Sequence, residues 1–486
     1  MSTNVPEREK KMSFWGALFV VVFLCVAMAI QIFVLEGAEW TTHITLIIAT
    51  VVAAIVAMAS GYKWKDIQEG ILYGCEIAML PMLILMMVGV LIASWIPAGT
   101  IPTLIYYGLK ILSPSVFLLT VCFVCSVASL ATGSSWTTGA TFGVAFMGVG
   151  LGLGIPAAMT AGAVISGSIF GDKMSPLSDS TNLAAGVGEA DLFDHIKSMM
   201  YTTIPALVLS LVIYGLMGLK FRSGEIDSTQ IDTILAGLKE SYWINPVTLI
   251  PPILVVILAV KRVGGLAVMV IASIVGMLFA MIFQGVGLSD MLNYLNYGFT
   301  STTGIEEIDA LLSRGGLQSM MWTISLGFIA LSFGGLLEKT KMLSVLLEKM
   351  SGLVNKVGGL IVTHVVASIA VNLFSASQYM AIIIPGRMLV PAYKKLHILP
   401  QVCSRTCEDS GTVTSPLVPW GLCGVFFTGA LGVATVEYLP YVYLAFLAPI
   451  IAIIYGLTNK FIFKEGEIKS VKTYHDEEAV AETVES

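Results

Sequence analysis

Long runs of apolar residues recur along the chain and are separated by short polar stretches. The runs are close to the ~20 residues that an α-helix needs to cross the hydrocarbon core of a bilayer. This pattern predicts an all-α, polytopic transmembrane helical bundle of about 10–14 membrane segments, some of them broken. The apolar runs cover residues 14–33, 44–59, 77–96, 116–131, 202–219, 246–260, 267–283, 320–337 and 438–457.

The composition agrees with this pattern and excludes a soluble globular domain. Hydrophobic residues make up 56% of the 486 residues and charged residues 12%, whereas soluble domains carry about 25% charged residues. The net charge of −6 matters less than where the charges lie, because charge placement orients a membrane protein. We therefore expect a lipid bilayer as the main partner and no nucleic acid.

Basic residues gather at both ends of the chain, three before residue 14 and four between residues 460 and 472. By the positive-inside rule both termini are expected to be cytoplasmic, in a multi-pass protein of a bacterial inner membrane. The predicted organisation is a cytoplasmic N-terminal segment (1–13), a first transmembrane repeat (14–219), a connecting loop (220–245), a second repeat (246–459) and a cytoplasmic tail (460–486). The loop can hold at most one short surface helix.

Two polar, helix-breaking stretches interrupt the apolar pattern at residues 171–182 and 407–419. Each contains carboxylates, hydroxyls, glycine and a Ser-Pro-Leu triplet, and Ser175 and Ser415 are 415 − 175 = 240 positions apart. Charge at membrane depth costs about 2.5–3.5 kcal/mol per residue and persists mainly at ion or substrate pathways. Paired breaks in two halves of a chain are typical of secondary transporters, with the binding site at the bilayer midplane.

A weak internal repeat supports two halves of opposite orientation. Polar interruptions at residues 133–139 and 372–378 follow long apolar spans in the same order, with Ser135 and Ser375 again 240 apart. The first loop of the first half is acidic (Glu36, Glu39), whereas the equivalent loop of the second half is basic (Lys261, Arg262). Corresponding loops on opposite sides of the membrane predict inverted repeats with broken helices or hairpins at the midplane.

Unwound backbone at membrane depth must line protein or a water-filled cavity. Gly133, Gly139, Gly171 and Gly411 are expected to supply unusual dihedrals. The freed carbonyls, hydroxyls and carboxylates would form an oxygen-rich site for a small hard cation such as Na⁺. The candidate ion or substrate residues are Ser134, Ser135, Thr137, Asp172, Ser175, Ser178, Asp179, Thr181, Asn182, Ser375, Ser377, Glu408, Asp409, Thr412, Thr414 and Ser415.

The acidic residues of the two breaks also have structural interpretations. Asp172 is the main candidate for ion or proton handling, but it could instead cap a helix or pair with Lys173. Asp179 could cap the helix that starts near it. Glu408 and Asp409 are adjacent, so one of them is expected to be structural, with Arg405 and Lys173 as candidate counter-ions.

The cysteines, histidines and enzyme motifs give no sign of other chemistry. Cys122 and Cys125 form a CxxC pair and Cys403 and Cys407 lie four apart, both in apolar surroundings without histidine partners in the sequence. These cysteines are expected to be small packing residues, and no transition-metal site or cofactor is predicted. The chain lacks HExxH, GxSxG and GxxxxGK[ST], so an enzyme is not predicted.

Several segments resemble the NhaC family of bacterial sodium/proton antiporters, over nearly the whole chain. The most specific is IFGDKMSPLSDSTNLAA at residues 169–185; the others are residues 95–109, 133–144 and 332–337. The resemblance implies an exchanger of the ion-transporter superfamily, with inverted repeats and a homodimer. The same family includes an antiporter that takes up malate and releases lactate while moving Na⁺ and H⁺.

The mechanism implied is competition between Na⁺ and a proton at buried Asp172, because burial disfavours the charged carboxylate and lets a proton compete. Sodium would then leave the cell as protons enter. The alternative is an organic-acid antiporter of the malate–lactate kind on the same fold, with Arg387 or Arg405 as candidate anion-binding groups. A more remote alternative is a sodium channel.

Overall fold

The computed structural model describes residues 11–34, 41–221, 228–351, 356–466 and 473–474, and almost all of them are helical. Within these ranges the only β-pairing consists of two isolated bridges, Phe299 with Arg314 and Ile398 with Lys464. Several charged residues from which the membrane orientation was predicted lie outside the described ranges, namely Arg8, Lys10, Glu36, Glu39, Lys469 and Lys472.

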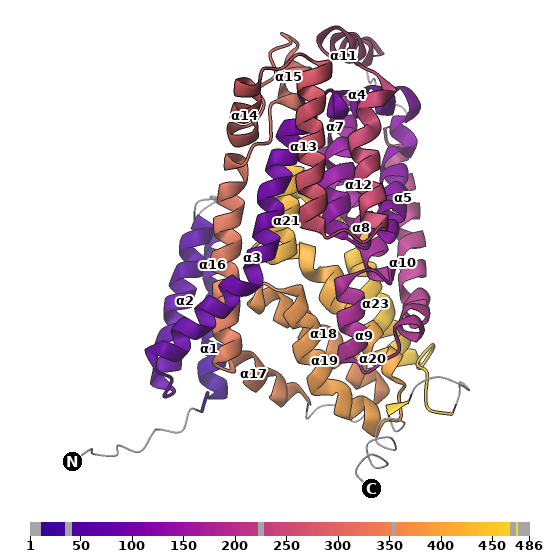
Figure 1. Cartoon of the computed structure of the whole chain (residues 1–486). Helices are drawn as coiled ribbons and strands as arrows, with labels where there is room; N and C mark the ends of the chain where they lie inside the picture. Colours follow the sequence, from indigo (N-terminus) through magenta and orange to yellow (C-terminus); the bar gives the residue numbers. More distant parts are fainter. Residues whose placement is uncertain (1–10, 35–40, 222–227, 352–355, 467–472, 475–486) are drawn as a thin grey trace, which may run out of the picture.

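The first half of the chain runs from α1 to α10 (Figure 1). Its elements are α1 (Phe14–Phe33), α2 (Thr41–Ala59), α3 (Trp64–Trp95), α4 (Thr100–Ile111), α5 (Pro114–Thr132), α6 (Ser135–Thr138), the π-helix η1 (Gly139–Gly143), α7 (Val144–Gly152), α8 (Ala157–Met174), α9 (Asp179–Val187) and α10 (Leu192–Leu219).

The second half begins with α11 (Ser228–Ser241), the single short helix expected in the connecting loop. It continues with η2 (Pro246–Leu249), α12 (Ile250–Val260), α13 (Gly265–Phe283), α14 (Leu288–Tyr297), α15 (Glu306–Leu312), η3 (Gln318–Met320), α16 (Met321–Lys339), α17 (Met342–Ser351), α18 (Val357–Ser375), α19 (Gln378–Lys395), α20 (Pro400–Cys407), the π-helix η4 (Glu408–Thr412), η5 (Ser415–Leu417), α21 (Leu422–Leu431), α22 (Thr435–Tyr438), η6 (Leu439–Tyr441) and α23 (Tyr443–Thr458).

The helices confirm a polytopic membrane protein. Eight helices among the described residues are long and apolar enough to cross a bilayer, and three further pairs bent at a short break bring the total to as many as 11. The upper figure lies within the predicted range. The broken pairs include the segment that carries the second polar break, α20 to η5 followed by α21, which bends by 48°.

The order of elements is similar in the two halves. Each contains a long span (α3, α16), a short helix (α4, α17), a span that stops at a polar turn (α5, α18) and a returning helix (α6 to α7, α19). The short helices α4 and α17 lie at opposite ends of the molecule (Figure 1). This placement supports the prediction of inverted repeats, which stays a prediction.

The two polar turns show which positions correspond. α5 ends at Gly133 (φ 68°) and α18 at Ala376 (φ 58°), both left-handed. The next residues, Ser134 and Ser377, each cap the following helix, accepting a hydrogen bond from the backbone N–H three residues later. These matching caps are 377 − 134 = 243 positions apart, so the offset of 240 through Ser135 and Ser375 does not align equivalent residues here.

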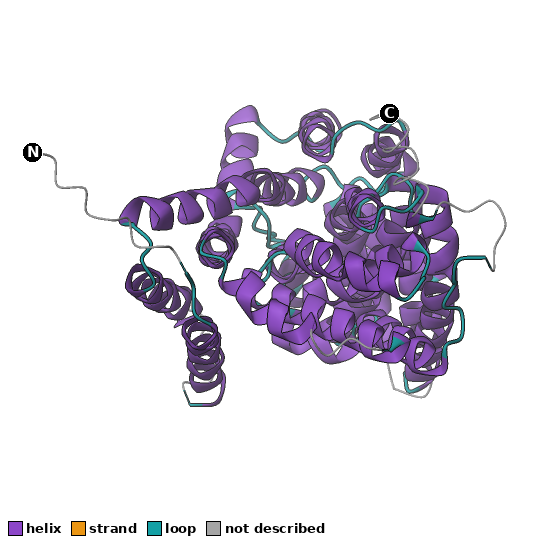
Figure 2. Cartoon of the chain, turned by 90° about the horizontal axis from the view of Figure 1, so that it is seen from below, coloured by secondary structure: helices purple, strands orange, loops and turns teal. Residues whose placement is uncertain are grey.

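Glycines allow the long helices of the two halves to approach closely. A Cβ on Gly74 of α3 would lie 2.0 Å from the carbonyl oxygen of Leu331 on α16, and one on Gly335 would lie 2.5 Å from the carbonyl oxygen of Gly70. Small residues at such crossings let transmembrane helices pack backbone to backbone. The α1–α2 pair, by contrast, lies at one edge of the molecule (Figures 1 and 2), where α2 packs against α16 and α1 against α17.

Candidate ion site

Asp172 lies in the last turn of α8, at the start of the first polar break. The helix ends at Met174 because Ser175 adopts an extended conformation (ψ 130°) and the following Pro176 has no N–H to continue a helix. α9 then begins at Asp179, with Ser178 as its N-cap residue. The short turn between the two helices folds the Ser178 side chain back toward Asp172.

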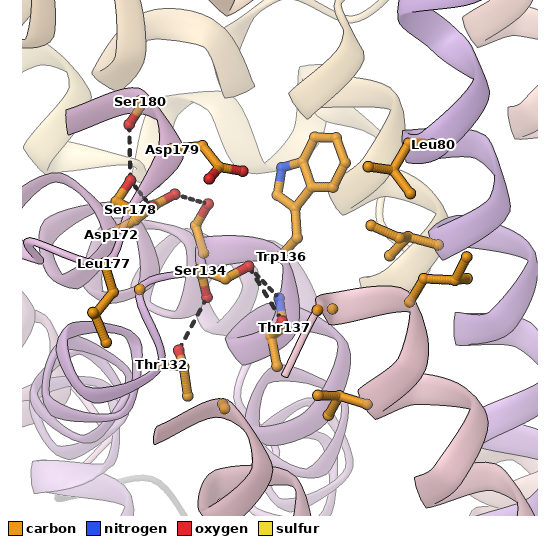
Figure 3. Close-up of a pocket in the computed structure, with 18 of the residues that line it drawn as sticks. Leu80, Thr132, Ser134, Trp136, Thr137, Asp172, Leu177, Ser178, Asp179 and Ser180 are labelled. Carbon is orange, nitrogen blue, oxygen red and sulfur yellow. Dashed lines mark hydrogen bonds between the residues drawn. The ribbon is translucent and has the colours of Figure 1, made fainter. Parts of the chain in front are cut away.

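Two serine hydroxyls hold the Asp172 carboxylate (Figure 3). Ser135 donates to Oδ2 at 2.6 Å and Ser178 donates to Oδ1 at 2.5 Å. The Ser178 oxygen lies 3.1 Å from the hydroxyl of Ser180, which extends the row of oxygens. Asp172 makes no ion pair with any described residue, and the neighbouring Lys173 faces another partner. Neither capping nor pairing with Lys173 therefore accounts for Asp172.

The first polar turn places Ser135 beside Asp172. Gly133 adopts the left-handed conformation that ends α5, and Ser134 caps α6 by accepting from the N–H and the hydroxyl of Thr137, both at 3.2 Å. Ser135 is therefore the first helical residue, and its side chain points at Oδ2 of Asp172. The π-helix η1 follows one turn later; such bulges occur frequently at functional sites.

A cavity of about 990 Å³ opens beside this cluster. The tip of the α12–α13 hairpin contributes Arg262 to its wall, and the start of α19 contributes Gln378 and Tyr379. Asp179 also lines the cavity, is exposed and has no bonded partner among the described residues, so it is not the cap of α9. Seven predicted residues line the cavity: Ser134, Ser135, Thr137, Asp172, Ser178, Asp179 and Asn182.

The remaining predicted residues of the first break support its backbone. Thr181 donates to the carbonyl oxygen of Lys173 at 2.9 Å, and Ser175 accepts from the N–H of Leu177 at 3.3 Å. The candidate set predicted from the sequence omits several residues of the cavity wall. Two of them had a recognisable signal beside an apolar span, namely the charge of Arg262 and the hydroxyl of Ser180. The omitted polar and aromatic residues are Thr132, Trp136, Ser180, Arg262, Gln378 and Tyr379.

The second polar break contacts the first through residues that do not line the cavity. Lys173 forms a fully buried ion pair with Asp409 of η4, and Thr202 of α10 donates to the same carboxylate oxygen at 2.9 Å. The guanidinium of Arg405 lies 4.0 Å from the other oxygen. Both expected counter-ions thus surround Asp409, which has a structural role in this conformation.

Glu408 differs from Asp409 although the two are adjacent. Its side chain is fully buried, yet neither carboxylate oxygen has a hydrogen-bond partner among the described residues. The hydroxyl of nearby Thr412 is also unpaired. A buried carboxylate without partners is costly unless it is protonated or binds a cation, so the surroundings of Glu408 favour a proton or a cation there.

Several other polar side chains of the second break and of the polar turn at residues 372–378 make hydrogen bonds within these two segments. Asn372 of α18 donates to the carbonyl oxygen of Gly411 at 2.5 Å and to Thr414 at 3.0 Å. Ser415 donates to the carbonyl oxygen of Thr412 at 2.7 Å. Ser375 and Ser377 form the turn before α19. None of these groups lines the cavity beside Asp172.

The comparisons with known proteins agree with this architecture. The sequence model described as the Na⁺/H⁺ antiporter family matches residues 8–181 and 167–460. The chain is 39% identical to the Na⁺/H⁺ antiporter NhaC of Alkalihalophilus pseudofirmus, over 92% of this chain and 96% of that protein. The chain belongs to the Na⁺/H⁺ antiporter family.

Relatives with other cargo are nearly as similar to this member of the Na⁺/H⁺ antiporter family. The malate-2H⁺/Na⁺-lactate antiporter of Bacillus subtilis is 36% identical over 93% of this chain and 96% of its own. The arginine/ornithine antiporter ArcD of Halobacterium salinarum is 36% identical over 94% of this chain and 95% of its own. The overall sequence identity therefore does not show which substrate this chain transports, and that question depends on the residues of the site.

Two local expectations about this family member are wrong. Of the four glycines expected to supply unusual dihedrals, only Gly133 has a positive φ. Gly171 instead allows close packing, because a Cβ there would lie 2.3 Å from the backbone nitrogen of Leu130 on α5. The interpretation of Cys407 as lacking a histidine partner is also wrong, since its Sγ lies 3.4 Å from Nε2 of His364.

Proposed function

We propose that this membrane protein is a secondary active transporter that exchanges Na⁺ for H⁺, with Asp172 as the group that binds them in turn. The observation that carries the proposal is the environment of Asp172, whose carboxylate receives two serine hydroxyls beside a cavity and has no cationic partner among the described residues. Membership of the Na⁺/H⁺ antiporter family supports the same conclusion.

The exchange of Na⁺ and H⁺ follows from the state of the Asp172 carboxylate, which accepts two hydrogen bonds but has no cationic partner among the described residues. When Asp172 is ionised, Na⁺ binds its oxygens together with the hydroxyl oxygens of Ser135 and Ser178, which suit a hard cation. When Asp172 takes up a proton, the negative charge is lost and Na⁺ leaves. Because the two ions compete for one group, proton entry drives sodium out. Neither catalysis nor a cofactor is part of this proposal.

The organic-acid antiporter remains the second candidate because of the size of the cavity. A volume of about 990 Å³ is at the upper end of the ~300–1,000 Å³ found for small-molecule sites. Arg262 and Gln378 line it together with the acidic residues, so a small carboxylate such as malate or lactate could bind there together with a cation. Arg262 lines the cavity and Arg387 and Arg405 do not, which favours Arg262 as the anion-binding group.

The decisive experiment uses the purified protein reconstituted into vesicles. Proton movement driven by a Na⁺ gradient without any organic acid supports Na⁺/H⁺ exchange. Strict dependence on malate or lactate supports the second candidate, and a large uncoupled conductance supports a channel. Asp172→Asn should abolish coupled exchange, because the amide keeps the shape of the side chain but cannot exchange a proton. Asp194→Asn is the control, because Asp194 pairs with the exposed Lys197 and does not line the cavity, and it should retain exchange.

We further place the protein in a bacterial cell membrane with both termini in the cytoplasm, functioning as a homodimer. The N-terminal Lys11 and the lysines near the end of α23 support this orientation. The dimer rests on the family resemblance and is tested by cross-linking in native membranes.

A further inference from the structure

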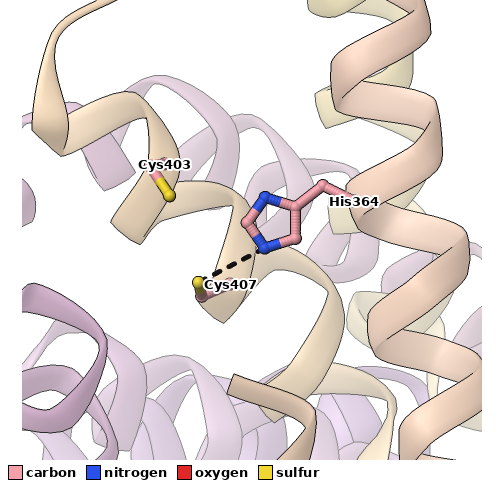
Figure 4. Close-up of side chains that lie close together, drawn as sticks. All are labelled: His364, Cys403 and Cys407. Carbon is pink, nitrogen blue, oxygen red and sulfur yellow. Dashed lines mark hydrogen bonds between the residues drawn. The ribbon is translucent and has the colours of Figure 1, made fainter. Parts of the chain in front are cut away.

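A cluster of three potential metal ligands lies outside the ion site. His364 comes from the middle of α18, and Cys403 and Cys407 come from α20 (Figure 4). One ligand atom from each residue lies within 4.8 Å of the others, and all three side chains are fully buried. The histidine and Cys407 are 43 residues apart in the sequence, which is why no local motif indicated the cluster.

The local geometry orients all three groups toward one point. Cys403 and Cys407 are four residues apart on one helix, so their sulfurs lie on the same face. Sγ of Cys407 is 3.4 Å from Nε2 of His364, and the other ring nitrogen, Nδ1, is 2.9 Å from the hydroxyl of Tyr393 on α19. A hydrogen bond from Nδ1–H to Tyr393 leaves the Nε2 lone pair facing the two sulfurs. Such second-shell partners are typical of metal-bound histidines.

We propose that His364, Cys403 and Cys407 bind one thiophilic d¹⁰ metal cation, Zn²⁺ or Cu⁺. Two thiolates and an imidazole are the ligands that these ions prefer, whereas Na⁺ prefers oxygen. Zn²⁺ would balance the charge of the two thiolates, which suits their apolar surroundings. Cys403 lies in an apolar cluster with Leu360 and Val402, and Cys407 lies in another with Val187 and Ile382. Cu⁺ would be satisfied by three ligands without water.

The position of this metal site gives it a direct link to the second break. The ion would join α18 to α20 at Cys407, and the next residue along the chain is the buried, unpaired Glu408. The site is thus separate from the Asp172 cavity, whose wall contains none of the three ligands. Binding of the metal does not depend on the proposed exchange of Na⁺ and H⁺.

The test measures metal on the full-length protein. Cells are grown with added Zn²⁺ or with added Cu²⁺, which cellular thiols reduce to Cu⁺, and the protein is purified in detergent with reductant and without chelator. Mass spectrometry then counts the metal, with about one ion expected per chain because the three ligands converge on a single point. The metal that co-purifies tells Zn²⁺ from Cu⁺.

Variants of the ligands provide the comparison. Cys403→Ser combined with Cys407→Ser, and separately His364→Gln, should each lose the metal. The control combines Cys122→Ser with Cys125→Ser, a buried pair on α5 without a histidine ligand nearby, and should keep it. Metal-free wild-type protein after both supplements, metal retained by the ligand variants, or a Cys403–Cys407 disulfide found by peptide mapping would each overturn the proposal.

A spectroscopic measurement on the wild-type protein tests the site even if the variants fail to fold. The chelator-treated protein is titrated with Co²⁺, and thiolate-to-cobalt charge-transfer absorption is expected, which Zn²⁺ should abolish. A cobalt spectrum without sulfur ligands would contradict the site whatever the variants do.

Discussion

Lys173 from the first polar break and Asp409 from the second form a fully buried ion pair, although 236 residues separate them in the sequence. The pair joins α8 of the first half to η4 of the second. Asp172, the residue next to Lys173, faces the cavity instead. Of these two neighbours, Lys173 connects the halves, whereas Asp172 is the group that we propose to bind ions.

Breaking this pair should destabilise the protein. Asp409→Asn leaves the charge of Lys173 buried without its partner, and removal of one member of a buried pair costs about 3–5 kcal/mol. We expect a clearly lower thermal unfolding temperature in detergent. Lys173→Met should also destabilise, and the double variant should lose less than the sum of the two. The control Lys197→Met removes an exposed partner of Asp194 and should change stability by less than ~1 kcal/mol. Strictly additive losses would show that the two residues do not interact.

The hydroxyls around Asp172 should set the affinity for Na⁺. Ser135→Ala and Ser178→Ala each remove one hydroxyl from the carboxylate, and each should raise the Na⁺ concentration that gives half-maximal exchange. Their effects should be non-additive, because ligands of one ion are coupled. Ser126→Ala is the control, since the buried Ser126 hydroxyl donates to the carbonyl oxygen of Cys122 within α5 and does not line the cavity. Unchanged Na⁺ dependence in both site variants would remove these hydroxyls from the site.

Glu408 and Asp409 should respond differently to the same isosteric change. Glu408→Gln removes a titratable group that has no hydrogen-bond partner in the described part of the chain, so the unfolding temperature should change little while exchange slows or its proton dependence changes. Asp409→Asn should mainly lower the unfolding temperature. The measurements are thermal unfolding in detergent and the pH dependence of exchange in vesicles. Wild-type exchange at every pH with Glu408→Gln would assign Glu408 no part in transport.

The inverted-repeat prediction can be checked by the sidedness of α4 and α17. Lys110 on α4 and Lys349 on α17 are both exposed and lie on helices at opposite ends of the molecule. In a background without native cysteines, Lys110→Cys should react with an impermeant thiol reagent added from the periplasmic side. Lys349→Cys should react only after the membrane is opened. Labelling of both from the same side would contradict the inverted arrangement.

The sequence was informative where chemistry and chain geometry are local. A proline and several hydroxyls after Asp172 predicted a broken helix, and the structure has α8 ending at Met174. The resemblance to the antiporter family could likewise be recognised from the segment around Asp172, and the comparisons confirm it.

Contacts between distant segments could not be predicted in the same way. Lys173 and Arg405 were expected as counter-ions of the Glu408–Asp409 pair, but the sequence did not show which of the two carboxylates they would meet. No local pattern shows that His364 faces Cys407, because helix packing brings these residues together. The register of the repeats was also missed. The residue that caps α19 is Ser377 and the one that caps α6 is Ser134, an offset of 243, whereas the sequence prediction paired Ser135 with Ser375 at an offset of 240.

The glycine crossing of α3 and α16 has a consequence for movement during transport. At Gly74 and Gly335 the two backbones interlock so closely that not even a methyl group would fit between them. Surfaces that fit together in this way resist sliding, because each small displacement would force backbone atoms of one helix against those of the other. The two long helices would then behave as a fixed frame, and the access of the Asp172 cavity to either side of the membrane would have to change by movement of the remaining helices against it.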